Sequence, residues 1–150
     1  MSPAEESADT LVVRRLLPAP REQVFAAWLD PESLAQWMCP GDVSSVKVEV
    51  DPRVGGKLRF VMMRGENGVE HRGEYLIIEP PSRLSFTWIS EFTDRLPSVV
   101  TIELLERGAL TELVLTHRRV PDRNVSAHRK GWTDIVQKLE DTLAGRSAGD

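Results

Sequence analysis

Two histidines and one tyrosine are the residues of this sequence whose types and spacing could carry proton-transfer chemistry. His71 and Tyr75 lie four residues apart in a segment predicted to be a strand, so they share one of its faces. His117 shares a face with Leu113 and Leu115 in the last such segment. An imidazole in an apolar chamber can give or take a proton near neutral pH. These three residues are the candidate catalytic residues, and the plainer alternative is that both histidines are hydrogen-bonded strand residues.

Three other residues attract attention but are expected to carry no chemistry. His128 falls on a predicted helix and is expected to be solvated, and Cys39, the only cysteine, is interpreted as a small, partly buried apolar side chain. Gly131 interrupts the same helix and predicts a close approach by a strand or short helix. The sequence lacks the H-E-x-x-H, C-x-x-C and G-x-G-x-x-G patterns. We therefore expect no metal site and no cofactor.

Composition and charge restrict the partners. The chain has 150 residues, of which 41% are hydrophobic and 28% charged, which is typical of one globular domain. A net charge of −4 with interspersed acids and bases argues against nucleic-acid binding, which needs concentrated Lys and Arg. No charged leader and no long apolar run is present, so we expect no export, no membrane insertion and a cytoplasmic location.

Apolar spacing predicts a first strand and three helices that must position these residues. Residues 10–17 are rich in β-branched residues and leucine and predict a strand. Residues 21–29 predict a short amphipathic helix, and Asp30 is placed to cap a second one that begins at Pro31. Residues 125–143 predict one long helix. The two short helices are marginal in water by themselves, so they must pack against something larger.

Between residues 44 and 116 the apolar period changes to two, which predicts antiparallel strands joined by hairpins. The pair Asn67-Gly68 predicts a tight turn, because these residues accept positive φ angles. Together with the first strand, this makes about seven strands in consecutive hairpins. A flat sheet of this size would expose an apolar face, so the sheet must curl.

The predicted fold class is α+β, with a curved antiparallel sheet of about seven strands around a long C-terminal helix and two short helices after the first strand. One domain spans residues 10–144, and residues 1–9 and 145–150 are predicted to be flexible termini.

The concave face of this sheet and the helices that cover it are rich in large apolar side chains. The alternation favours a cavity, because one helix can hardly fill so wide a sheet, although close packing without usable space is the alternative. The residues predicted to contact a ligand there are Trp28, Trp37, Met38, Phe60, Met62, Tyr75, Phe86, Trp88, Leu115, His117, Trp132 and Val136.

Three blocks of sequence, in order along residues 10–144, resemble a known family. They run from Arg15 to Trp37, from Asp51 to Gly56 and from Gly131 to Leu139. They are similar to the bacterial branch of proteins homologous to an activator of the heat-shock chaperone ATPase, within the START-like (SRPBCC) superfamily. The resemblance implies the helix-grip fold, whose internal cavity holds lipids, sterols, polyketides or other apolar ligands and is a catalytic chamber in some members.

Three functions are compatible with the sequence. The first is binding of a small apolar or aromatic molecule. The second is an enzyme that cyclises, dehydrates or hydrolyses a small carbonyl compound in the same cavity. The third, implied by the family, is a partner that stimulates a chaperone ATPase in the stress response; we rank it last, because such co-chaperones resemble a longer, two-domain arrangement. The sequence is also compatible with a homodimer formed through a sheet edge or a helix face.

Overall fold

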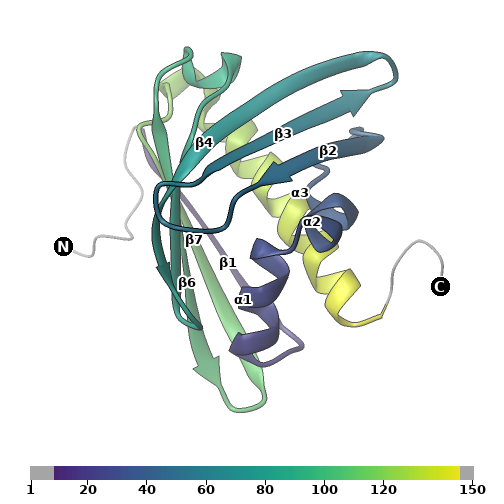
Figure 1. Ribbon diagram of the computed structural model, residues 1–150, viewed down its shortest axis with the longest axis vertical. Helices are drawn as coiled ribbons and strands as arrows, with labels where there is room; N and C mark the ends of the chain where they lie inside the picture. The colour runs from purple at the N-terminus through teal and green to yellow at the C-terminus, as the bar shows by residue number, and fades with distance from the viewer. Residues whose placement is uncertain (1–8, 146–150) are drawn as a thin grey trace.

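The computed structural model describes residues 9–145 and shows a curved sheet around one long helix (Figure 1). The described strands form a single antiparallel sheet in the order β1-β7-β6-β5-β4-β3-β2. The strands are β1 (Leu11–Leu17), β2 (Ser45–Val50), β3 (Lys57–Arg64), β4 (Asn67–Glu79), β5 (Arg83–Trp88), β6 (Ser98–Arg107) and β7 (Leu110–Arg118). Consecutive hairpins join β2 to β7 only. β1 pairs instead with β7, because the helices that follow β1 carry the chain to the opposite edge of the sheet.

The helices occupy the ranges that apolar spacing predicts. The α-helices are α1 (Arg21–Leu29), α2 (Pro31–Trp37) and α3 (Val125–Leu143), and short 3-10 turns are η1 (Glu91–Thr93) and η2 (Asp122–Asn124). The Asp30 carboxylate accepts a hydrogen bond from the Glu32 amide at 3.0 Å, and Pro31 is the first residue of α2. In Figure 1, α3 crosses the hollow of the sheet, and α1 and α2 lie beside it. Among the described residues, none of the helices has the length and apolarity needed to cross a membrane.

The hairpin between β3 and β4 turns earlier than the sequence predicts. Arg64 pairs with Asn67, so Gly65 and Glu66 make the two-residue turn, and Asn67 and Gly68 begin β4. Gly65 has a φ of +61°, which suits the first position of a type II′ turn. The tight turn therefore uses Gly65, and the Asn-Gly pair extends the strand ladder instead.

The core lies between the concave face of the sheet and the three helices. Trp28 of α1 and Trp37 of α2 are buried edge to face, with ring centroids 4.7 Å apart. The Trp37 indole N–H donates to Ser33 at 2.9 Å. These contacts supply the tertiary support that helices of this length need.

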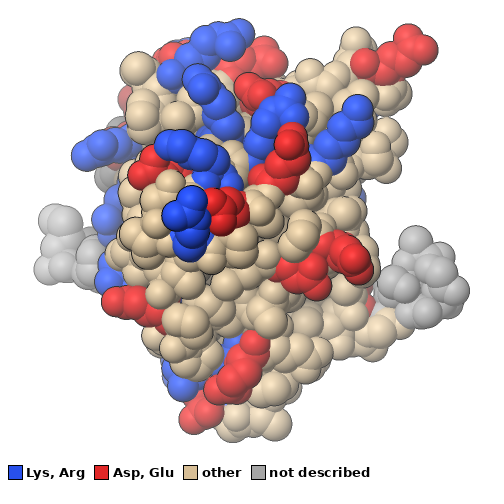
Figure 2. Space-filling model, in the orientation of Figure 1, with Lys and Arg blue, Asp and Glu red and all other residues tan. Residues whose placement is uncertain are grey.

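Charged side chains on the outside of the sheet pair with one another. Arg59 of β3 bonds Glu49 of β2 at 2.7 Å and Glu70 of β4 at 2.5 Å, and Lys57 bonds Glu74 at 2.6 Å. Positive and negative side chains also lie next to one another on the face shown in Figure 2. This mixing is the opposite of the concentrated positive charge that a nucleic-acid backbone attracts.

Candidate functional site

A pocket of about 340 Å³ opens between α3 and the end of the sheet that carries β3, β4 and β5. Its inner wall is apolar, and it combines Met62 of β3, Trp88 of β5 and both Trp132 and Ile135 of α3. The rings of Trp88 and Trp132 are 5.2 Å apart. Phe92 of η1 lines the pocket as well and is 40% exposed. Elements far apart in the sequence thus supply one apolar wall.

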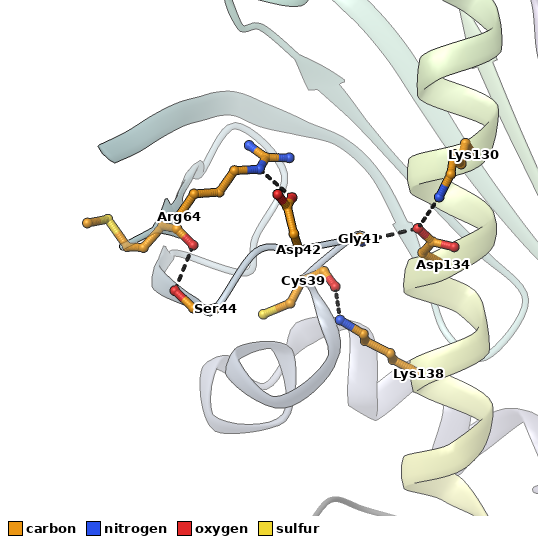
Figure 3. Close-up of polar contacts among 9 residues, drawn as sticks. Cys39, Gly41, Asp42, Ser44, Arg64, Lys130, Asp134 and Lys138 are labelled. Atoms are coloured by element: carbon orange, nitrogen blue, oxygen red, sulfur yellow. Dashed lines mark hydrogen bonds and ion pairs between the residues drawn. The ribbon is translucent and has the colours of Figure 1, made fainter. Parts of the chain in front are cut away.

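Four charged side chains line the pocket, and each has a partner of opposite charge (Figure 3). Arg64 Nε donates to Asp42 at 2.6 Å, and Lys130 Nζ donates to Asp134 at 3.2 Å. The hydrogen bond and the charge of Arg64 lower the pKa of Asp42, so its carboxylate is ionised at neutral pH. The two ion pairs balance their own charges and leave no net charge from these four groups.

The loop of residues 38–44 borders the pocket and is tied to α3. The Gly41 amide donates to Asp134 Oδ2 at 3.1 Å, and Lys138 Nζ donates to the Cys39 carbonyl (Figure 3). Gly131 was predicted to allow a close approach by a strand or short helix, but its neighbour in the structure is Pro40 of this loop. A Cβ added at Gly131 would lie 3.7 Å from Pro40 Cβ, which is ordinary contact, so the approach is by this loop and leaves room for a methyl group.

His71 of β4 lines the pocket with a ring that makes no hydrogen bond through Nδ1. The side chain is only 7% exposed, and its ring lies 5.0 Å from that of Trp88. Nδ1 is buried without a hydrogen-bond partner. Burial lowers the pKa of His71 to about 4, against a weaker opposing effect of the Val69 carbonyl, so the ring is neutral at pH 7. A neutral imidazole still offers one donor and one acceptor.

His117 is fully buried, and both of its ring nitrogens are occupied. The Trp132 indole donates to Nδ1 at 3.0 Å, and Nε2 lies 2.7 Å from the Ser98 hydroxyl. That hydroxyl donates to the Trp88 carbonyl at 2.5 Å, so its oxygen accepts the proton that His117 carries on Nε2. Burial holds the pKa of His117 well below its usual value. The geometry is that of the plainer alternative, a hydrogen-bonded strand histidine.

His128 corrects the expectation of a solvated helix residue. It is half-buried and lines the pocket, and its ring lies 5.1 Å from that of His117. Nδ1 lies 2.9 Å from the Asn124 carbonyl, which can only accept, so Nδ1 carries the proton. Burial lowers the pKa of His128 too. The first turns of α3 pack over the end of β7, and helical spacing alone did not reveal this.

Tyr75, the remaining candidate for proton transfer, does not line the pocket. It is buried beside Phe86, with ring centroids 6.3 Å apart, and burial raises its pKa to about 12. The structure therefore separates Tyr75 and His117 from the open space and leaves His71 beside it.

The predicted ligand-contact residues divide into two groups. Met62, Trp88 and Trp132 line the pocket. The others are buried in the interior without lining it: Trp28, Trp37, Met38, Phe60, Tyr75, Phe86, Leu115, His117 and Val136. Sequence reasoning missed Ile135 and Phe92, and of the polar residues at the pocket it found only His71. The missed residues could be identified as lining the pocket only after the structure showed which end of the sheet the helices leave uncovered.

The comparison with protein families shows to which family the chain belongs. Residues 18–144 match the model of the family described as Activator of Hsp90 ATPase homolog 1-like protein. This chain belongs to that family. Among proteins of curated function, none matches this member of the family. Within the described residues, no group of three or more His, Cys, Asp or Glu side chains is arranged to hold a metal ion.

Solved structures share the fold of this chain. A Rhodobacter sphaeroides protein has a TM-score of 0.80 and 26% identity, covering 94% of this chain and 96% of its own. A Mesorhizobium loti protein has a TM-score of 0.74 and 29% identity, covering 91% and 97%. An HSP90 activator from Plasmodium falciparum has a TM-score of 0.71 and 23% identity, covering 91% and 96%. The helix-grip fold and the START-like family predicted from the sequence are confirmed.

Proposed function

We propose that this protein binds a small, largely apolar or aromatic molecule in the pocket between the sheet and α3. The observation that carries the proposal is the wall of Met62, Trp88 and Trp132 beside about 340 Å³ of open space. That volume lies in the range of small-molecule sites, about 300 to 1,000 Å³. An aromatic guest gains about 25 cal/mol for each Å² of apolar surface that leaves water.

The test uses N-phenyl-1-naphthylamine, an uncharged probe that fluoresces in apolar surroundings. We expect saturable binding by the wild-type protein. Ala127→Phe should weaken it at least about tenfold, because Ala127 is an exposed residue of α3 that lines the pocket, and a phenyl ring there takes up the space of the guest.

Ser126→Phe is the matched control, since Ser126 is the exposed neighbour of Ala127 and does not line the pocket. Equal binding by the two variants would show that the probe binds elsewhere. Failure of this probe and of a panel of apolar metabolites to bind the wild-type protein would end the proposal.

An enzymatic use of the same pocket would depend on His71, the member of the predicted catalytic trio that lines it. A neutral imidazole can act as a base toward a bound carbonyl compound. If a substrate is found, His71→Phe should abolish its turnover while the substrate still binds. Unchanged turnover would remove His71 from the chemistry.

Stimulation of a chaperone ATPase is the second candidate function, and the family match supports it. It would place the protein in the cytoplasm, with a part in the stress response. The measurement is the ATPase rate of a purified Hsp90-type chaperone with and without this protein. An unchanged rate, together with no association of the two proteins, would exclude this role.

A further inference from the structure

Nδ1 of His71 calls for an explanation, because it is buried without a hydrogen-bond partner and buried polar atoms nearly always have one. In the described residues, the buried side-chain atoms without one are Arg21 Nε, Trp28 Nε1 and His71 Nδ1. Of these three residues, only His71 lines the pocket. Nδ1 itself is enclosed, whereas the other ring nitrogen, Nε2, is not among these buried atoms and makes no hydrogen bond within the described residues. Nε2 is therefore the nitrogen that a ligand in the pocket can reach.

The charges around the pocket narrow the chemistry of that ligand. Arg64 and Lys130 are each bonded to a carboxylate, and neither is left over to neutralise an anion. A carboxylate that entered the apolar part of the pocket would lose its hydration without gaining a cation. The two histidines that line the pocket are neutral at pH 7, because burial lowers the pKa of each. The pocket therefore favours an uncharged guest.

A hydroxyl group matches His71 better than a group that can only accept or only donate. A neutral imidazole has one N–H and one lone pair, and either of them can stand at Nε2 of His71. A hydroxyl both donates and accepts, so it can bond either tautomer. An aromatic ring that carries this hydroxyl would lie against Trp88, whose ring is 5.0 Å from that of His71.

We propose that the pocket selects an uncharged aromatic molecule with a hydroxyl group, and that His71 recognises the hydroxyl by a hydrogen bond. This inference rests on the proposed binding function and adds the class of ligand. His71 is then the residue that determines specificity, while the tryptophans supply most of the affinity.

The experiment compares three probes that share one ring system: naphthalene, 2-naphthol and 2-naphthoate. Their dissociation constants are measured near pH 7 by displacement of N-phenyl-1-naphthylamine. We expect the wild-type protein to bind 2-naphthol about tenfold more tightly than naphthalene, which is the usual worth of one hydrogen bond. We expect 2-naphthoate to bind more weakly than 2-naphthol.

His71→Phe keeps an aromatic ring beside Trp88 and removes the nitrogens. It should bind naphthalene as the wild-type protein does and lose the preference for 2-naphthol. Ser126→Phe is the control, because Ser126 does not line the pocket, and it should keep the preference. Loss of the preference in both variants, or a preference kept in His71→Phe, would overturn the assignment to His71.

A second measurement does not depend on whether the variants fold. The imidazole nitrogen signals of His71 in the wild-type protein should shift on addition of 2-naphthol and much less on addition of naphthalene. Equal affinity of the wild-type protein for naphthalene and 2-naphthol, or equal shifts, would overturn this inference and leave the binding function standing. Absence of binding by all three probes would count against the binding function itself.

Discussion

At the scale of single residues, His117 joins the long helix to the sheet. Its Nδ1 accepts a hydrogen bond from the Trp132 indole of α3, and its Nε2–H donates one to the Ser98 hydroxyl of β6, which in turn donates to the Trp88 carbonyl of β5. This chain of hydrogen bonds therefore runs from α3 through β7 and β6 to β5. It orients the indole of Trp132 and ties down the backbone of Trp88, the two residues whose rings border the pocket. His117 supports the site without lining it.

Burial of the histidines predicts that the protein loses stability in mild acid. Burial lowers the pKa of His71 to about 4 and that of His117 well below 6.5, whereas in the unfolded chain both groups titrate near 6.5. Between these values the unfolded chain binds more protons than the folded one. The free energy of unfolding is therefore at its full value above about pH 6.5 and declines as the pH falls toward about 4.

His71 alone should account for about 2 kcal/mol of this decline between about pH 7.5 and about pH 5. Urea denaturation at the two pH values measures it. His71→Phe should show a smaller decline than the wild-type protein, because it lacks one of the groups that titrate. A decline of the same size in both proteins would contradict the assignment, and so would a free energy of unfolding that does not change with pH.

At the scale of elements, the pocket depends on the loop of residues 38–44. This loop has no regular structure of its own beyond a turn, and its place is set by the bonds from Gly41 to Asp134, from Lys138 to Cys39 and from Arg64 to Asp42. Figure 3 shows how they hold the loop between α3 and β3. Exposed pairs of this kind add little to global stability, but they can restrict a local motion.

Cys39 reports on that motion, because it is the only cysteine and is buried in the same loop. Burial also raises the pKa of its thiol, which slows its reaction. Asp134→Ala removes the bond from Gly41, so we expect a thiol reagent to label Cys39 several times faster, with little change in the free energy of unfolding.

Lys130→Ala is the control for this measurement, since it removes the ion pair with Asp134 and leaves the bond from Gly41 in place. Its labelling rate should stay close to that of the wild-type protein. If both variants are labelled at the wild-type rate, the bond from Gly41 to Asp134 does not hold the loop.

At the scale of the whole molecule, the curved sheet is filled by its own side chains over most of its length and left open at one end. Trp28 and Trp37 occupy the interior near the short helices, whereas Trp88 and Trp132 border the open end. A guest in that opening contacts β3, β4, β5 and α3 at once. Unfolding would have to release it, so binding and global stability are linked.

A ligand of the pocket should therefore raise the melting temperature. At about 100 times its dissociation constant, a guest adds about 2.7 kcal/mol to the free energy of unfolding. For a chain of this length that corresponds to a shift of about 5 to 10 °C. Calorimetry with N-phenyl-1-naphthylamine measures the shift, which should be lost in Ala127→Phe and kept in Ser126→Phe. A shift of equal size in both variants would indicate binding outside the pocket.

Much of the fold could be predicted from local signals. The ranges of α1 and α3 follow from helical spacing, and the start of α2 follows from Asp30 and Pro31. The pairing of β1 with β7 could not be predicted in this way, because it joins residues about a hundred positions apart. The turn at Gly65 was missed for a different reason. Two neighbouring pairs, Gly65-Glu66 and Asn67-Gly68, could each form the turn of this hairpin, and only the register of the two strands decides between them.

The sequence by itself determined which side chains are apolar and which face of each element they share, because both follow from residue type and backbone period. It therefore predicted the curved sheet and an interior rich in tryptophan, while the family was indicated by the resemblance of three blocks of sequence. Only the tertiary structure decided which of these rings fill the core and which border open space. The same holds for the ring nitrogens of His71 and His117, since a hydrogen-bond partner depends on which distant strand or helix comes within 3 Å or so.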